Sequence, residues 1–529
     1  MIVLDQIRIS VFEKKPEQAL IAAVAKRLHV KHEAIHAIHI KKRSIDARRK
    51  PEVFFLYTVW VETPEEKRLL RTAQGRYAIH KAEEEVYRIP KASGRLSFRP
   101  VVVGFGPAGM FAAYLLALCH TRPIVIERGK EAAQRQKDVE LFFKNGQLDC
   151  NSNVQFGEGG AGTFSDGKLN TQKNDKFGRN RFVLSTFHRF GADASILYDA
   201  RPHIGTDRLV HIVTNLRREI LHLGGEIHFS TCLDRLLTGN SGITGITLTS
   251  GKTIETKAVI LAIGHSARDT FETLYRQQIN MEAKPFAVGF RVEHPQIFIQ
   301  ESQYGKKAAS LLPAAPYRLV AKGERDLYSF CMCPGGYVIN ASSEHKRLCV
   351  NGMSRSDRGS GNANSALVMP VGGDCFDLSF PLSGLHFARA LEEKAFSLGN
   401  GRIPQQLFGD YVANRFSRGY GAFSSQSRGQ VCLCNLRGLL PEALEKTFVE
   451  GVLKMDQKIK GFANEEMILS GIESRTSSPV RIPRDHRFMG SVPGLFPCGE
   501  GAGYAGGITS AAMDGLKTAE ALLAYYDKY

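Results

Sequence analysis

The sequence predicts an α/β fold that contains a Rossmann-type dinucleotide-binding domain, an inserted α+β substrate or cap domain, and a small N-terminal α+β module. Three observations predict it. Residues 99–109 form an apolar strand that ends in a glycine-rich turn. Residues 494–509 again place a strand before a glycine-rich loop and a helix, and residues 1–95 carry strands and helices of their own. A chain of 529 residues has room for two or three domains.

The early glycine turn has the GxGxxG spacing of a dinucleotide-binding loop. Its first glycine allows the tight turn, its second lets the backbone approach a pyrophosphate, and its third lets helix and strand pack closely. The next strand, residues 123–126, delivers Glu127 at the distance where a carboxylate binds an adenosine ribose. An unliganded turn is the less favoured alternative, because strand, turn, helix, strand and acid appear in order. The predicted contacts are Gly104, Gly106, Pro107, Ala108, Gly109, Glu127 and Arg128.

A second binding segment lies near the C-terminus, where a strand ends at residues 498–500 and two glycines open a helix over residues 510–526. The N-terminus of that helix can face an electron-rich ring edge. A nicotinamide enzyme has no need of this distant site, whereas FAD is long enough to require one. The sequence therefore predicts FAD, with contacts from Gly499, Glu500, Gly501, Gly506, Gly507 and Ile508.

The glycine-rich segment at residues 152–169 and the strand that ends at Gly264 complete a wider pattern. The chain resembles the FAD-dependent oxidoreductases with a single Rossmann-type domain, which include fumarate reductase flavoproteins and geranylgeranyl reductases. The resemblance implies that segment 152–169 is a second flavin loop, although a surface loop is the alternative. It assigns to the cofactor Gly159, Gly160, Gly162, Thr163, Ser165, Asp166, Gly167, Lys168 and Gly264.

Over most of its length the chain is similar to the bacterial FAD-utilising dehydrogenase family of unassigned substrate. Three segments carry this similarity: Ser44–Arg48, Cys333–Gly336 and Glu473–Val480. It implies a fold and a cofactor without naming a substrate. In that superfamily an Asp often stands where this chain has Glu500, whose side chain is one methylene longer.

The predicted organisation is discontinuous. Residues 1–95 form the N-terminal module, residues 96–275 and 465–529 form the FAD-binding domain, and residues 276–464 form the cap. Periodicity predicts helices over 16–28, 208–223, 381–398 and 441–460, a hairpin over 243–249 and 252–263, and strands over 286–293 and 328–333. Residues 351–364, rich in Gly, Ser and Asn, are predicted to form a mobile loop. Outside the segments assigned to FAD, the sequence has no strand–GxGxxG–helix unit, so NAD(P)H as a transient electron donor would bind without a Rossmann site.

The substrate is expected between the cap and the flavin ring. The predicted catalytic residues are Arg475, Glu473, Arg291 and Glu293, and the predicted substrate contacts are Cys333, Gly335, Gly336, Arg355 and Arg481. A guanidinium offers two parallel donors to a carboxylate or phosphate. A salt bridge between Arg475 and Glu473, and an exposed strand end at residues 293–294, are the structural alternatives.

The net charge of +17 suggests an anionic substrate, or RNA bound by the N-terminal module, where 20 Lys and Arg face 12 Asp and Glu. Ten thinly spread cysteines predict reduced thiols, and their spacing predicts no metal site. The first 25 residues lack the apolar core of a signal peptide, and the sequence has no membrane-spanning run, so a soluble cytoplasmic protein is expected. The leading hypothesis is an FAD-dependent dehydrogenase or reductase of a small or medium-sized, anionic substrate. A flavoprotein acting on RNA and a non-catalytic flavin-binding regulator are the alternatives.

Overall fold

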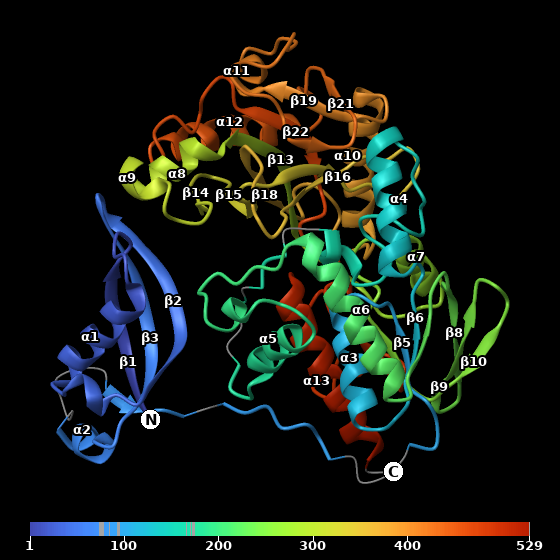
Figure 1. Ribbon diagram of the computed structural model, residues 1–529. Helices are drawn as coiled ribbons and strands as arrows, with labels where there is room; N and C mark the ends of the chain where they lie inside the picture. Colours follow the sequence, from blue (N-terminus) through green and yellow to red (C-terminus); the bar gives the residue numbers. More distant parts are fainter. Residues whose placement is uncertain are drawn as a thin grey trace.

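A parallel five-stranded sheet lies at the centre of the computed structural model (Figure 1). Its order is β24-β11-β5-β6-β7, built from β5 (Val101–Val103), β6 (Ile124–Ile126), β7 (Glu226–His228), β11 (Val259–Leu261) and β24 (Leu495–Pro497). Strands from both ends of the chain therefore share one sheet. Apart from the edge strand β7, they are short, apolar and almost wholly buried, as parallel strands covered on both faces are. This confirms the Rossmann-type fold.

The structure describes residues 1–72, 79–83, 85–91, 96–164, 167–169, 171 and 175–527. Within those ranges, every helix is too short or too polar to cross a membrane. All ten cysteines are free thiols.

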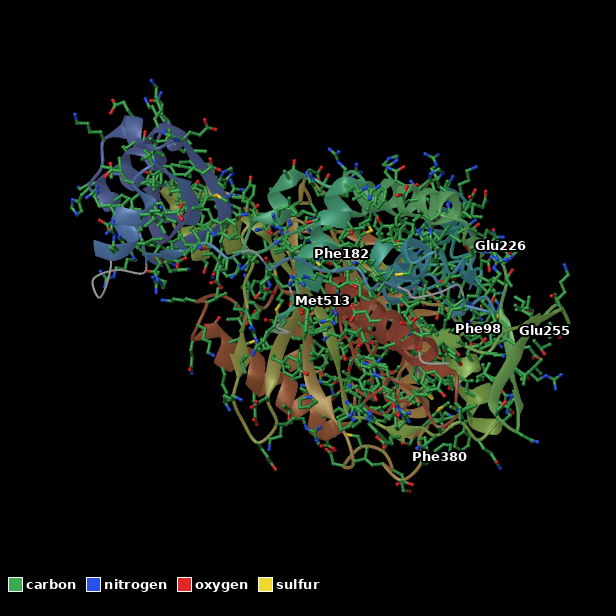
Figure 2. The ribbon with its side chains drawn as sticks, turned by 90° about the horizontal axis from the view of Figure 1, so that it is seen from below. Phe98, Phe182, Glu226, Glu255, Phe380 and Met513 are labelled. Atoms are coloured by element: carbon green, nitrogen blue, oxygen red, sulfur yellow. The ribbon has the colours of Figure 1, made fainter. Side chains whose placement is uncertain are left out.

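Helices flank the parallel sheet, and two of them, α3 and α13, cross at very close range. The flanking helices are α3 (Pro107–Leu118), α4 (Ala132–Asn145), α5 (Arg179–Arg189), α6 (Thr206–His222), α7 (Arg268–Arg276) and α13 (Ile508–Tyr526). Helix α3 is apolar all round because it lies between the sheet and α13. A Cβ atom at Gly515 of α13 would lie 2.1 Å from the Ala108 carbonyl oxygen, so the two helices touch through their backbones. Figure 2 shows Met513 of α13 inside the molecule and Glu255 at its periphery.

The N-terminal module is a βαββαβ unit with antiparallel sheet order β2-β3-β1-β4. It comprises β1 (Ile2–Ser10), α1 (Pro16–Leu28), β2 (Ala37–Arg49), β3 (Glu52–Glu62), α2 (Glu66–Thr72) and β4 (Ile79–Lys81). The module lies to one side of the rest of the chain (Figure 1). Strand β2 meets the body where Arg43 pairs with Asp199 at 2.8 Å and exchanges backbone hydrogen bonds with residues 198 and 200.

The cap is built on a seven-stranded sheet, ordered β14-β15-β18-β13-β22-β19-β21. These strands are β13 (Phe286–Pro295), β14 (Val320–Ala321), β15 (Leu327–Cys333), β18 (Asn362–Val371), β19 (Ile403–Leu407), β21 (Val431–Leu433) and β22 (Ile468–Glu473). A three-stranded sheet joins β16 (Tyr337–Asn340), β17 (Val350–Met353) and β20 (Ser427–Arg428). The cap helices are α8 (Gln296–Tyr304), α9 (Lys306–Ala309), α10 (Ser383–Gly399), α11 (Phe408–Val412) and α12 (Glu442–Asp456). In Figure 1 the cap lies above the parallel sheet.

Two segments differ from the sequence prediction. Residues 252–263 form two strands instead of one. The first, β10 (Thr253–Glu255), pairs with β9 (Gly242–Leu248), which also pairs with β8 (Leu233–Gly239). The second, β11, belongs to the parallel sheet, where it pairs with β5. The predicted mobile loop at 351–364 is strand only at its two ends, where β17 reaches residue 353 and β18 begins at residue 362. Its small polar residues serve buried strand positions where large side chains would not fit. A two-stranded pairing of β12 (Glu282–Ala283) with β23 (Val480–Arg481) lies where the cap joins the body.

Candidate functional site

One cavity of about 1360 Å³ lies at the carboxyl edge of the parallel sheet. Its wall contains Gly104, Gly106 and Glu127 from the first glycine turn, and Gly506, Gly507 and Ile508 from the start of α13. The two segments were expected to hold opposite ends of one extended ligand. Both reach the same cavity.

The second glycine loop connects these two ends. A Cβ atom at Gly160 would lie 2.9 Å from the Gly106 Cα atom, and one at Gly162 would lie 3.0 Å from Ile508 Cγ1. Residues 160–162 therefore touch both the pyrophosphate turn and the start of α13. Only residues without a side chain allow this approach.

Glu127 organises the first end of the cavity. Its carboxylate accepts backbone hydrogen bonds from Phe105 at 2.8 Å and from Gly129 and Gly157 at 2.9 Å. A carboxylate has about four acceptor positions, so one remains for a ligand hydroxyl. Beside it, Arg128 pairs with Asp269 at 2.8 Å and lies 4.2 Å from the centre of the Phe156 ring.

Arg135 holds the second glycine loop from behind. Its fully buried guanidinium donates to the backbone carbonyls of Asn153, Val154 and Glu158 at 2.7–3.0 Å. Burial lowers the pKa of Arg135 to about 10, although the charges of Glu127 and Glu158 oppose this change. The sequence pattern did not point to this residue, because the three carbonyls lie on another segment.

The cap sheet closes the other end of the cavity through Glu473. This carboxylate pairs with the buried Arg291 at 2.9 Å and 3.1 Å. The other donors of Arg291 go to Asn364 at 2.8 Å, the Cys331 carbonyl at 3.2 Å and Asn351 at 3.2 Å. Burial lowers the pKa of Arg291, but the Glu473 charge outweighs it and raises the pKa well above its ordinary value.

Arg475 also lines the cavity, but its partner is Glu392 of α10. The two groups form a two-pronged ion pair at 2.9 Å and 3.1 Å, and the remaining amine of Arg475 donates to Ser266 and Ser343. Glu392 also accepts from Arg268 at 2.7 Å. Burial would raise the pKa of Glu392, and the charges of Arg268 and Arg475 instead hold it far below its usual range. The expected Arg475–Glu473 salt bridge is therefore wrong, because each residue pairs with a partner distant in sequence.

Glu293 and His294 are buried rather than exposed at a strand end, which corrects the structural alternative. Glu293 accepts from Asn362, Ser425 and the Gln426 backbone, and burial raises its pKa. His294 lies on the opposite face of β13, and burial lowers its pKa to about 4. Neither residue is among those that line the cavity.

The predicted substrate contacts also lie away from the cavity wall. Cys333 is buried, and its thiol lies 3.3 Å from the Cys331 carbonyl oxygen. Cys331, and not Cys333, lines the cavity. The turn at Gly335–Gly336 packs on residues 353–362, and Arg355 and Arg481 are exposed.

The predicted cofactor residues divide into three groups. Gly104, Gly106, Pro107, Ala108, Glu127, Arg128, Gly160, Gly162, Gly264, Glu500, Gly506, Gly507 and Ile508 line the cavity. Gly109, Gly159, Thr163, Gly167, Lys168, Gly499 and Gly501 are described but lie outside its wall. Ser165 and Asp166 lie outside the described residues.

Several residues that line the cavity were not predicted as contacts, including Gln155, His265, Ser266, Phe330 and Asn351. His265 lies in the loop after β11, with Nδ1 3.5 Å from the Glu500 carboxylate. The carboxyl ends of neighbouring parallel strands meet at one edge, which explains this pairing. Only the position of His265 directly after the strand could have indicated it.

These residues fit FAD. The cavity joins a ribose-binding carboxylate, two backbone glycine turns and the N-terminus of a 19-residue helix. Ring-side polar groups come from the cap.

Comparisons with known proteins agree with this geometry. The chain is 44% identical over 526 residues to an uncharacterized protein of Clostridium beijerinckii, covering 98% of this chain and 97% of the relative. Residues 285–476 match the family model "FAD-dependent protein, C-terminal domain-like", and residues 1–62 match a domain of unknown function.

Among solved structures, E. coli quinol fumarate reductase has 11% identity and a TM-score of 0.36, covering 82% of this chain and 70% of that one. A geranylgeranyl bacteriochlorophyll reductase-like protein of Thermoplasma acidophilum has 12% identity and a TM-score of 0.34, with 82% and 83% covered. Similarity at this level does not bear on substrate or reaction. The chain belongs to the family that includes the Clostridium protein, and its residues 285–476 match a domain of FAD-dependent proteins.

Proposed function

We propose that the protein is an FAD-dependent dehydrogenase or reductase whose small or medium-sized, anionic substrate binds between the cap sheet and the flavin ring. The observation that supports it most is the shared cavity, in which Gly106, Gly507 and Glu473 line one space. When bound, FAD supplies hydride or electron transfer. The chain's own residues would orient the substrate and exclude water.

The predicted catalytic residues divide by role in this proposal. Glu473 presents a carboxylate to the cavity, and Arg291 fixes its position from the buried side. Arg475 has most of its donors occupied by Glu392, Ser266 and Ser343, so we propose that it positions the wall and supplies positive charge near the ring. Glu293 is too remote from the cavity for a direct role.

We also propose the predicted division of the chain with one change. Strand β22 lies within the cap sheet, and the family match continues to residue 476. The last cap residue is therefore placed near 476 instead of 464. A cytoplasmic location remains part of the proposal.

Purification followed by reconstitution with FAD tests the proposed activity. We expect flavin absorbance and rapid reduction by a small-molecule donor in anaerobic stopped-flow experiments, followed by substrate turnover. Absence of bound flavin after reconstitution would contradict the proposal. Bound flavin that no donor reduces would instead favour the non-catalytic regulator.

A second candidate function is action on RNA. On the face of the N-terminal sheet opposite α1, Lys41 Nζ lies 3.7 Å from the Trp60 ring centre, and the Arg8 guanidinium lies 5.7 Å from that of Phe54. Aromatic and basic side chains together bind single-stranded RNA. Gel-shift measurements at low salt would show weaker binding in Trp60→Ala if this reading holds. Equal binding in both proteins, or none, would contradict it.

A further inference from the structure

Four segments converge beside the second flavin loop: residues 167–169, 200–207, 334–336 and 354–360. Thr206 donates its backbone amide to the Ser354 carbonyl at 3.2 Å, and the Ser356 amide donates to Asp207 at 2.8 Å. A Cβ atom at Gly205 would lie 1.9 Å from the Ser356 nitrogen. These segments therefore pack backbone against backbone and form a fixed platform.

The platform carries three arginines that have no carboxylate within 4.0 Å among the described residues: Arg201, Arg355 and Arg358. The Nε atom of Arg358 is enclosed and lacks a hydrogen-bond partner in the described part of the chain. Burial raises the pKa of Asp207, but hydrogen bonds from Ser356 and the charge of Arg355 lower it below its ordinary value. Both carboxylate oxygens of Asp207 already accept from Ser356. This differs from Arg291 and Arg475, whose donors are taken up by protein groups.

The side chain of Tyr304 locates two of these cations relative to each other. Burial raises the pKa of Tyr304, and the charges of Arg201 and Arg358 oppose that rise. The charges of Arg201 and Arg358, which belong to two of the converging segments, thus act on the same phenol. Arg355 and Arg358 belong to one tight turn, in which the Arg358 amide donates to the Arg355 carbonyl at 3.2 Å.

Three segments of the platform continue along the chain from residues that line the flavin cavity. Gly162, Cys331 and Asn351 line the cavity, and the platform residues Gly167, Gly335 and Arg355 follow them within five residues. A molecule anchored on the arginines can thus extend toward the ring. Guanidinium groups bind phosphate in a planar, two-pronged geometry.

We propose that Arg201, Arg355 and Arg358 form an anion-binding site that holds the phosphate groups of a nicotinamide dinucleotide while it reduces the flavin. The inference rests on the proposed function. It explains how a chain whose GxGxxG segments are all assigned to FAD receives a second dinucleotide. The donor transfers its hydride to the flavin and leaves as the oxidised nicotinamide, and the arginines take no part in that transfer.

Binding of inorganic pyrophosphate tests the site without any reaction. We would measure it by titration calorimetry on the FAD-loaded wild type, the double variant Arg201→Gln/Arg358→Gln, and the control Arg218→Gln. Arg218 is an exposed arginine of α6 that has no carboxylate within 4.0 Å among the described residues, so its variant shows what the loss of one positive charge away from the platform does. We expect about tenfold or greater weakening in the double variant and no change in the control. Equal affinity in all three proteins would overturn the site.

Anaerobic flavin reduction by NADPH and by NADH identifies the source of the phosphate. In the double variant, the donor concentration for half-maximal reduction should rise about tenfold while the limiting rate stays unchanged. An effect confined to NADPH indicates its additional phosphate, and an effect on both donors indicates the pyrophosphate. Unchanged half-saturation, or pyrophosphate binding with no reduction by either donor, would overturn the assignment. Failure of FAD to bind would defeat the proposed function separately, because pyrophosphate binding can still be measured.

Discussion

Glu127 shows how one side chain sets both the shape and the chemistry of the site. Its carboxylate fixes three backbone amides from two glycine loops and still faces the cavity. The sequence predicted the ribose contact from spacing alone. It did not predict the amides at Gly129 and Gly157, because that pairing depends on how the second loop folds back.

Replacing Glu127 with Gln tests this double role. The amide nitrogen would face a backbone N–H donor, leaving at least one buried donor unsatisfied at a cost of about 1–3 kcal/mol. We expect a lower melting temperature and less FAD retained after purification. Glu255→Gln, at an exposed position on β10, is the control and should retain FAD as the wild type does. Full FAD content in Glu127→Gln would refute the role.

The buried pair of Arg475 and Glu392 gives stability a defined pH dependence. Because the folded-state pKa of Glu392 is depressed, its contribution is complete above the ordinary carboxyl value and is lost as the pH falls below about 4.3. Arg475→Gln should lower the unfolding free energy at pH 7 by about 3–5 kcal/mol, since it leaves a buried charge with one partner fewer.

Urea unfolding at pH 7, 5, 4 and 3 measures this effect. Above about pH 4 the loss is set by the unfolded-state pKa, which the two proteins share, so the wild type should lose more stability than Arg475→Gln between pH 4 and pH 3. Parallel losses in the two proteins would show that the ion pair does not hold the Glu392 pKa down. The sequence could not reveal this pair, because Glu392 lies 83 residues before Arg475 on a helix of the cap.

At the level of elements, the contact between α3 and α13 determines where the two ends of the cofactor lie. Both helices were predicted after glycine-rich turns, and α13 begins two residues before the predicted start. Gly515 was not singled out, since nothing in a helical pattern shows which side faces a neighbouring backbone.

Gly515→Ala should force these helices apart. The added methyl would lie 2.1 Å from the Ala108 oxygen, and overpacking of this kind costs about 1–3 kcal/mol. We expect a lower melting temperature and weaker FAD binding, measured by fluorescence titration. Gly419→Ala has open space around the added atom and serves as the control. Wild-type FAD affinity in Gly515→Ala would argue against the helix contact as the determinant.

Non-local pairing limited the prediction of other elements. Residues 252–263 have the alternation of one strand, yet a strand partner at β9 and another at β5 divide them. Residues 351–364 have a loop-like composition, but at both ends of the segment the neighbouring strands impose extended structure. The hydrophobic pattern therefore predicted helices such as α1 and α3 correctly. It failed for strands whose bounds depend on their partners in a sheet.

At the scale of the whole molecule, the cofactor site forms only because three distant regions meet. The first glycine turn, the second glycine loop and the start of α13 each contribute backbone, and the cap adds Glu473 and Arg475. Motif spacing identified the first three regions. The partners of the cap residues emerged only from the folded chain, as did the grouping of Arg201, Arg355 and Arg358 beside the second loop.

A crystal structure of the FAD-reconstituted protein tests the central claim most directly. The account predicts one extended FAD, with its pyrophosphate at Gly106, its ribose on Glu127, and its ring between Gly507 and Glu473. A cofactor bound only at the Gly104–Glu127 end, with the space beside α13 left to other atoms, would contradict it.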